Sequence, residues 1–276
     1  MVKTPELSAI ATTIRQDIIE MLQSAQSGHA AGPLGMADIF ATLYFHVLRH
    51  RPQQPHWTHR DRVIVSNGHI CPVLYASLAR SGYFPVEELQ TLRQFGSRLQ
   101  GHPNRLEVPG VENSSGPLGQ GYSIAVGTAL ALQLEGNSAQ VYCITSDGEH
   151  NEGQTWEAIM SAAKYKLHNL AVIIDRNNIQ IDGYTEAIMP LESLRAKYEA
   201  FNWHVIEIDG HNFEEIIDAC QIAKAIFEKP VAIIAHTIPG KGVDFMEHKP
   251  EWHGKAPTSQ QAAAALKQLR KKSSND

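Results

Sequence analysis

Apolar and polar positions alternate regularly over the second half of the chain. Apolar runs of strand length alternate there with helical periods: the runs are 140–146, 170–175, 204–208 and 231–236, and the helical stretches are 153–167, 191–201 and 213–228. Strands rich in valine and isoleucine that alternate with helices are typical of a parallel sheet covered on both faces. The pattern therefore predicts the α/β class, with a parallel sheet and helices on both of its faces.

The first half of the chain is predicted to decorate that sheet with helices. Its helical stretches lie at about 6–26, 36–48, 71–81, 85–95 and 118–135. A glycine- and proline-rich stretch, 101–116, comes before the last of them. After the final strand, a loop at 238–257 precedes an amphipathic helix and a polar tail, 258–276. Because there is no internal repeat and no low-complexity linker, residues 1–276 are predicted to form a single domain.

The composition excludes several classes of protein. The 276 residues are 43% hydrophobic and carry a net charge of −5, which gives no electrostatic reason to expect nucleic acid or an anionic membrane as partner. The longest apolar runs have the length of strands and are too short to cross a bilayer. Cys71, Cys143 and Cys220 lie far apart without a CxxC pair, which indicates reduced thiols in a cytoplasmic protein.

A carboxylate and an amide are predicted to meet at one edge of the sheet. Asp147 follows the strand 140–146, and Asn177 follows the next strand. A right-handed crossover brings the carboxyl ends of parallel strands to the same edge, where open α/β sheets bind ligands. Oxygen ligands of this kind suit a hard cation that also binds phosphate, and Gly148 would let a phosphate approach the backbone. An ordinary Asp-Gly turn is the alternative that the spacing leaves open.

The same residues resemble a known cofactor motif. Asp147-Gly148, followed about thirty residues later by Asn177-Asn178, is similar to the thiamine diphosphate-binding motif of thiamine-dependent enzymes, although Ser146 stands where the family usually has glycine. Further stretches narrow the resemblance to the transketolases: SGHAAGPLGMAD (27–38), SNGHICPVLYA (66–76), GHPN (101–104), SSGPLGQGYSIAVG (114–127), IQIDG (179–183) and EWHGKAP (251–257). The resemblance covers about 10–257 and implies the thiamine diphosphate-binding fold, in its diphosphate-binding domain.

The resemblance implies a set of cofactor ligands. Asp147, Asn177 and the carbonyl of Ile179 would hold Mg²⁺, with Ca²⁺ or Mn²⁺ as alternatives, and Gly148 would contact the diphosphate through its backbone. The thiazolium side of the cofactor would be lined by Gly116, Pro117 and Leu118. Read without the family, 114–118 would be a plain helix cap with Pro117 at the first helical position.

Histidine is unusually frequent, with 14 in the chain. Four that stand next to glycine, His29, His69, His102 and His253, match histidines that surround the reacting carbons in transketolases. The resemblance implies that His69 and His253 touch diphosphate and substrate oxygens, and that His29 and His102 bind the C1 and C2 oxygens of the donor. An unperturbed pKa near 6.5 lets such rings give and take protons near neutrality. Six others are taken as surface or packing residues: His46, His50, His56, His59, His168 and His204.

Three acidic residues have more than one interpretation. Glu152 and Glu157 stand near the start of the helix predicted at 153–167, where acids are favoured by the helix dipole or take part in a capping arrangement. In the transketolases, the glutamate that matches Glu152 lies at the subunit interface, so an interface role and a dipole role both stay open for it. For Glu157 the two roles are equally favoured. Asp182, before Gly183, is interpreted as a turn former.

The resemblance reaches only the first domain of a transketolase. Thiamine chemistry moves a two-carbon ketol unit from a ketose to an aldose, and a glutamate on a separate pyrimidine-binding domain activates the cofactor. We find no candidate for that glutamate in this chain. The resemblance therefore implies a split transketolase, in which this N-terminal subunit works with a C-terminal partner subunit, two of each in a heterotetramer, on a sugar or sugar-phosphate substrate.

Two other functions compete with this interpretation. One is the α-type subunit of a 2-oxo acid dehydrogenase, which uses a similar diphosphate domain; the loop histidines and GPLGQG (116–121) argue against it. The other is a non-catalytic regulatory subunit that keeps the fold. It is disfavoured because a scaffold has no physical need of Asp147, Asn177 and four glycine-flanked histidines.

Overall fold

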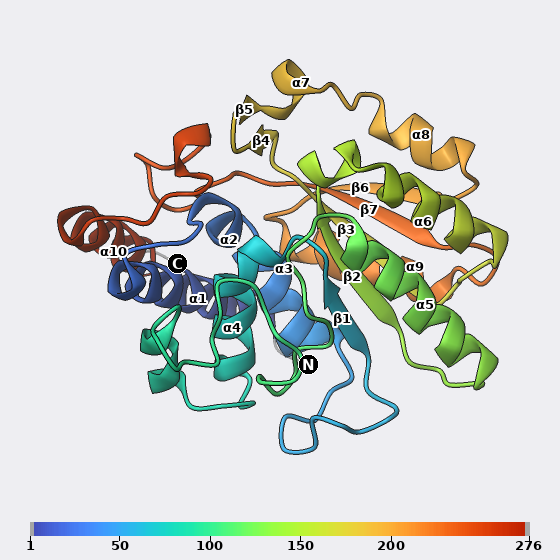
Figure 1. Ribbon diagram of the computed structural model, residues 1–276, viewed down its shortest axis with the longest axis horizontal. Helices are drawn as coiled ribbons and strands as arrows, with labels where there is room; N and C mark the ends of the chain where they lie inside the picture. The colour runs from blue at the N-terminus through green and yellow to red at the C-terminus, as the bar shows by residue number, and fades with distance from the viewer. Residues whose placement is uncertain (1–2, 274–276) are drawn as a thin grey trace.

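A five-stranded parallel sheet forms the centre of the computed structural model, which describes residues 3–273 (Figure 1). The strands lie in the order β1 (Arg62–Val65), β2 (Val141–Ser146), β3 (Leu170–Arg176), β7 (Val231–His236) and β6 (His204–Asp209). All four neighbouring pairs are parallel. The predicted sheet is confirmed. Of the five strands in this sheet, the pattern did not predict β1, which has only four residues and begins with the charged Arg62.

Helices cover both faces of the sheet, because side chains along each strand point to alternate faces. In β2, Tyr142 and Ile144 join one core cluster while Val141 and Cys143 join the other. The first cluster is closed by α1 (Thr4–Ala25), α3 (Ala37–Thr42), α4 (Cys71–Arg80) and α9 (Phe213–Ala225). The second is closed by α5 (Gln120–Leu134), α6 (Gly153–Lys164) and α8 (Leu194–Ala200). Figure 1 shows α5 and α6 running side by side along their face.

Two helices differ from the predicted pattern. The stretch predicted as one helix over 36–48 is divided into α3 and a π-helical turn, Leu43–Val47, and is preceded by a short α2 (Ala31–Gly35). At Gly35 a Cβ would lie 2.9 Å from the carbonyl oxygen of Ile238, so the backbone here packs directly against the chain that follows β7. The helix predicted over 85–95 is only a 3-10 turn, Val86–Thr91, and the backbone turns left-handed at Arg93, with φ 58°.

The first and last helices of the chain pack together on one side of the sheet. The C-terminal helix α10 (Ser259–Ser273) lies against α1, as predicted for an amphipathic helix (Figure 1). The last residues of the predicted polar tail, 274–276, lie outside the described part of the chain. Within residues 3–273, no helix has both the length and the apolar character needed to cross a membrane. The three cysteines are buried and free.

A small hairpin follows the carboxyl end of β3. Strands β4 (Ile179–Gln180) and β5 (Gly183–Tyr184) pair antiparallel, and α7 (Thr185–Ile188) follows directly. Asp182 stands in the turn between the two strands, as predicted. Figure 1 shows the hairpin and α7 at the top of the view, above the sheet. The hairpin therefore continues the chain directly from Asn177, at the edge where the site was predicted.

Candidate active site

Asp147 follows the last residue of β2, and its side chain is fully buried. Its Oδ1 accepts a hydrogen bond from the Gly148 N–H at 2.6 Å. Its Oδ2 accepts from the Asn178 N–H at 2.6 Å and from Nη1 of Arg176 at 3.0 Å. Burial raises the pKa of Asp147, and Arg176 and the backbone donors oppose that rise. An ordinary surface turn would leave the carboxylate in water, so the buried position favours a ligand role.

Asn177 reaches the same edge from β3. Ser146 pairs with Asp175 in the sheet, and the Asp147 N–H donates to the Asp175 carbonyl at 3.1 Å, so the chain segments that carry Asp147 and Asn177 leave neighbouring strands together. The Asn177 side chain accepts from the Ile179 N–H at 3.0 Å and donates to Asp175 at 2.7 Å. The structure thus brings the two predicted ligands to one edge through their backbones.

The oxygen atoms at this edge fit a hard divalent cation. Carboxylate, amide and carbonyl oxygens from Asp147, Asn177 and Ile179 are the donor types that Mg²⁺ and Ca²⁺ prefer. Asp147 Oδ1 and Asn177 Oδ1 each accept one hydrogen bond from the protein, and an sp² oxygen can accept two. Each atom therefore keeps a lone pair for a cation, and a cation would offset the cost of burying Asp147.

Glu149 joins three loops around the site, although the sequence did not single it out. Its side chain is buried, and Oε1 accepts from the Ser66 hydroxyl and from the Gly119 N–H. Its other oxygen accepts from the Ser146 N–H at 3.4 Å. Burial raises the pKa of Glu149 to about 7. The residue fastens the start of α5 to the ends of β1 and β2. Only the position of this acid just after a strand, within SDGEHNEG (146–153), could have pointed to it, because its burial is seen only in the fold.

The glycines around the start of α5 are of two kinds. Gly119 has φ 83°, and a Cβ there would lie 2.7 Å from Gln154; at Gly121 it would lie 2.4 Å from Ser66. Packing therefore requires both. Within residues 3–273, no atom would lie within 4 Å of a Cβ at Gly116. Protein packing does not require that glycine, which fits its predicted position against a ligand.

The structure corrects the assignment of Pro117 to the first position of a helix. The helix α5 begins at Gln120, so Pro117 and Leu118 lie in the loop before it, next to Gly116. The Leu118 carbonyl accepts a hydrogen bond from the Gln154 side chain at 2.7 Å, which fixes the loop to α6. At Gly148 a Cβ would approach Gln180 at 3.2 Å, so a larger residue would crowd the edge of the site there.

Three of the four predicted histidines form one cluster. The ring centroids of His29 and His69 are 5.0 Å apart, those of His69 and His253 5.1 Å, and those of His29 and His253 5.5 Å. His69 lies in the 3-10 turn Gly68–Ile70, which follows β1, and His253 follows the turn Pro250–Trp252. His102 lies in an exposed loop, near enough for its charge to affect His29 and His69. Three loops that are distant in sequence therefore meet beside the ends of β1 and β2.

All four histidines are held in the neutral form near pH 7. Burial lowers the pKa of His29 to about 4, and the charges of His253, Arg93 and His102 add to the effect. Burial also lowers the pKa values of His69, His102 and His253. A neutral imidazole has one donor and one acceptor nitrogen, so the cluster can bind hydroxyl and carbonyl oxygens from several sides.

Arg93 lies near the histidine cluster, although the sequence did not indicate it. Its guanidinium lies over Gly101, where a Cβ would be 2.6 Å from Nε, and its charge lowers the pKa values of His29 and His102. No periodicity or motif marks a basic residue at this position. Only the folded loop brings it to the histidines.

Several buried polar atoms at this edge lack a hydrogen-bond partner within the protein. In the described residues they include Nδ1 of His29, both amide atoms of Asn67, the Ser115 hydroxyl and Nε2 of Gln180. Buried polar groups are nearly always satisfied in native proteins. Orphaned donors and acceptors gathered around one edge fit a polar, phosphate-bearing ligand, as the cofactor predicted from the motif is.

The other histidines and the two helix acids lie outside this cluster. His50 contacts the Tyr83 hydroxyl and the Tyr44 carbonyl, as expected for a packing residue. His150, which the sequence did not single out, is buried and contacts the Ser146 carbonyl at 2.8 Å and the Tyr198 hydroxyl at 2.7 Å. Glu152 is the N-cap residue of α6 and Glu157 lies one turn on; both are exposed, so dipole and interface roles remain predictions.

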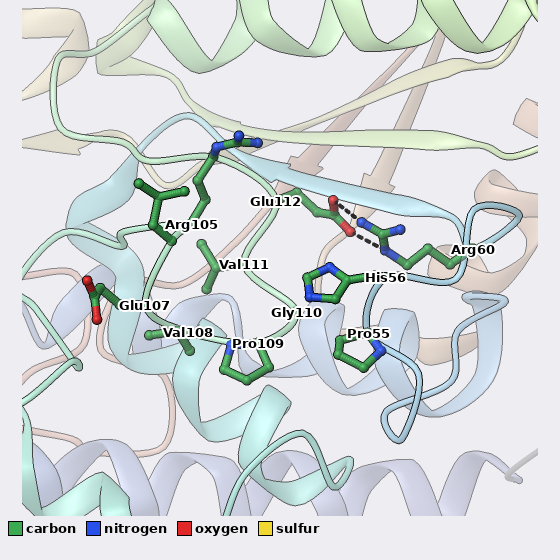
Figure 2. A pocket seen from close by; sticks show the side chains of 11 residues that line it. Pro55, His56, Arg60, Arg105, Glu107, Val108, Pro109, Gly110, Val111 and Glu112 are labelled. Atoms are coloured by element: carbon green, nitrogen blue, oxygen red, sulfur yellow. Dashed lines mark hydrogen bonds and ion pairs between the residues drawn. The ribbon is translucent and has the colours of Figure 1, made fainter.

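A separate pocket lies between residues 55–60 and 105–112, and it contains none of the predicted site residues (Figure 2). Arg60 makes two hydrogen bonds of 2.8 Å to Glu112, drawn as dashed lines in Figure 2. The charges of this pair neutralise each other. We interpret the pair as a structural ion pair that fixes the loop before α5 to the segment that leads into β1.

Comparison with known proteins agrees with the fold and identifies the family. The family model for transketolase, thiamine diphosphate binding domain, matches residues 7–274. The chain is 43% identical to the 6-deoxy-6-sulfo-D-fructose transketolase subunit SqwG of Clostridium sp. (strain MSTE9), over 96% of this chain and 97% of that protein. It is 40% identical to one of the subunits of the apulose-4-phosphate transketolase of Phocaeicola vulgatus, over 92% of this chain and 90% of that protein.

A solved transketolase has the same fold over nearly the whole chain. The structure of the enzyme from Campylobacter jejuni superposes with a TM-score of 0.90 at 36% identity, over 98% of this chain. The match covers only 43% of the Campylobacter chain. This chain thus has the length of the subunit relatives and spans under half of that solved transketolase.

Proposed function

Because the chain belongs to the transketolase family, as its thiamine diphosphate-binding part, we propose that it is the N-terminal subunit of a two-chain transketolase. The enzyme would move a two-carbon ketol unit from a ketose or ketose phosphate to an aldose. The observation that carries the proposal is the meeting of three histidine rings, 5.0 to 5.5 Å apart, at the sheet edge that also holds the buried Asp147.

Thiamine diphosphate, when bound, supplies an electron sink for the two-carbon unit. In the proposal Asp147, Asn177 and the Ile179 carbonyl hold Mg²⁺, or Ca²⁺ or Mn²⁺ in its place. The Gly148 backbone contacts the diphosphate. Gly116, Pro117 and Leu118 line the other end of the cofactor, and the open space beside Gly116 supports that position.

The histidines would orient the sugar. Neutral rings at His29 and His102 would bind the C1 and C2 oxygens of the donor, while His69 and His253 would bind diphosphate and substrate oxygens. The low pKa values support this role, because a neutral ring can donate to a carbonyl oxygen with one nitrogen and accept from a hydroxyl with the other. Each ring could then hold or pass a proton at a fixed oxygen.

A second chain would complete the site, in an assembly with two of each subunit. The exposed face of α5 supports such a partner: the helix has no charged residue, and its exposed positions are Gln120, Ser123, Ile124, Gly127, Ala131, Gln133 and Leu134. A surface helix of a lone domain normally carries charged residues on its outer face. Exposed Met160 and Tyr165 extend the apolar surface near α6. The free, buried cysteines support a cytoplasmic location for this assembly.

The named relatives define the substrates to test. The assembly should be captured from its own cells and assayed with thiamine diphosphate, Mg²⁺ and an aldose acceptor. Two donors come from the names of those relatives, 6-deoxy-6-sulfo-D-fructose and apulose 4-phosphate. Two more are the sugars bound in solved transketolases from Pichia stipitis, xylulose 5-phosphate and fructose 6-phosphate. We expect ketol transfer from at least one donor by the assembly and none by the isolated chain. Turnover of pyruvate-like acids without turnover of ketoses would instead identify a 2-oxo acid dehydrogenase subunit.

A further inference from the structure

Arg176, the last residue of β3, joins the predicted metal ligand to a separate segment. Its side chain is 7% exposed. Nη1 donates to Asp147 Oδ2 at 3.0 Å, and Nη2 donates to Glu186 at 2.5 Å and to Glu192 at 2.7 Å. The planar fork of a guanidinium suits several carboxylates at once. One side chain therefore links the sheet edge to both glutamates of the stretch 183–193, called here the 183–193 segment.

The 183–193 segment has limited packing of its own. Tyr184, Ile188 and Met189 are exposed, while Leu191 is buried. Its other polar ties include the Thr185 N–H to the Asn178 carbonyl at 3.0 Å and the Tyr184 hydroxyl to the His248 carbonyl at 3.2 Å. Segments with few buried contacts open most easily. The order of this segment should thus depend on the two bonds from Arg176.

The same group of side chains sets the charge beside the predicted cation. Asp147, Glu186 and Glu192 carry three negative charges and Arg176 one positive charge, so the group has a net charge of −2. A divalent cation would neutralise it. The proposed function, in which Asp147 holds a divalent cation, is the premise of this step. We propose that Arg176 is a positioning residue that fixes the 183–193 segment to Asp147 and sets the charge of the cation site.

The first test measures whether Arg176 holds the 183–193 segment in place, an interaction called here the tether. It needs no cation. Chymotrypsin digestion of the full chain, followed by mass spectrometry of the fragment that ends at Tyr184, reports how often the segment opens. We expect Arg176→Gln and the double variant Glu186→Gln/Glu192→Gln to be cleaved about tenfold faster than the wild type. Arg195→Gln is the matched control, since Arg195 is exposed and pairs with Glu199 and Glu207 instead. Arg176→Lys, which keeps the charge, should be intermediate.

The second test measures how the charge of this group affects cation binding. Binding of Mn²⁺ to the native assembly in the presence of thiamine diphosphate is followed by electron paramagnetic resonance. Removing a positive charge should tighten Mn²⁺ binding about tenfold in Arg176→Gln, and removing two negative charges should weaken it by a similar factor in the double variant. Arg195→Gln should bind as the wild type does. Opposite signs cannot come from structural damage, which would weaken binding in both.

The outcomes separate this proposal from the proposed function. Cleavage of both variants at the wild-type rate would refute the tether, and weaker Mn²⁺ binding in both would refute the charge role. If Arg176→Gln does not fold, the double variant still decides the tether through its cleavage rate, and Mn²⁺ binding in it as tight as in the wild type would refute the charge role. A wild-type assembly that binds no Mn²⁺ would refute the proposed function and the charge role with it, while the cleavage rates would still decide the tether.

Discussion

The carboxylate side and the histidine side of the site are built in different ways. On the carboxylate side, Asp147 and Asn177 follow adjacent strands. Backbone N–H groups donate to the side chains of both residues, and the Asn177 side chain also donates to Asp175. On the histidine side, three rings from three distant loops meet by packing, and Nδ1 of His29 has no hydrogen-bond partner among the described residues. The sheet thus organises the carboxylate side before any ligand binds. The histidine side instead keeps an unpaired hydrogen-bonding atom that a ligand can contact.

Breaking the carboxylate side should have the largest effect. Asp147→Asn removes the anionic ligand from the proposed cation site, so we expect thiamine diphosphate affinity at saturating Mg²⁺ to fall by at least about 100-fold. The measurement is the cofactor content of the purified assembly. Asp182→Asn, in the exposed turn between β4 and β5, is the matched control. Unchanged cofactor content in the Asp147 variant would contradict the metal assignment.

Breaking the histidine side should reduce turnover and leave the cofactor in place. His29→Asn removes a ring that is assigned to donor oxygens, and loss of such a group typically lowers kcat by about 100-fold. Steady-state kinetics and cofactor content are measured on the same preparation, with His56→Asn, an exposed histidine, as control. If the His29 variant lost cofactor as fully as the Asp147 variant, the two sides would not differ in role.

The histidine side should also give the stability of the chain a pH dependence. The pKa of His29 is about 4 in the folded chain, below its ordinary value of 6.5, so the fold favours the neutral ring. Above pH 6.5 the ring is neutral in both the folded and the unfolded chain, and it does not lower the free energy of unfolding. As the pH falls from 6.5 to 4, the unfolded chain binds the proton first, and the free energy of unfolding decreases by roughly 1 to 3 kcal/mol. Urea unfolding at several pH values should therefore show a shallower loss for His29→Asn than for the wild type. If the free energy of unfolding depended on pH in the same way in both proteins, the proposed contribution of His29 would be refuted.

The smallest effect is expected outside both sides, on α6. Glu157→Gln alters an exposed carboxylate, so the free energy of unfolding of the isolated chain should change by less than about 0.5 kcal/mol. Glu152→Gln should be equally mild in the isolated chain. If Glu152 has its interface role, Glu152→Gln should weaken assembly with the partner, as analytical ultracentrifugation would measure. Assembly of Glu152→Gln as tight as that of the wild type would leave Glu152 with its dipole role, and the same measurement on Glu157→Gln decides between the two roles of Glu157.

The difference between the two sides also explains what the sequence could predict. Strand periodicity and the crossover rule lead directly to Asp147 and Asn177, because both follow strands that pair in the sheet. No such rule connects His29, His69 and His253, whose loops meet only through tertiary packing; the resemblance alone grouped them. Glu149 and Arg93 were missed for the same reason. The position of Pro117 was misjudged because α5 begins only after Gly119, where φ is positive.

Local geometry accounts for the elements that the pattern misplaced. β1 has only four residues, and an alternating pattern needs more length to be visible. The 3-10 turn Val86–Thr91 has helical periodicity, but the backbone reverses at Arg93 before an α-helix can form. Long periodic stretches such as α1 and α9 were predicted to within a few residues.

Native mass spectrometry of the protein, captured gently from its own cells, tests the central claim most directly. The account predicts two copies of this chain with two copies of a longer second chain, carrying thiamine diphosphate and a divalent cation. The sequence of that second chain should contain the glutamate that activates the cofactor. This chain alone, or bound to an unrelated protein without cofactor, would contradict the account and favour a non-catalytic subunit that has kept the fold.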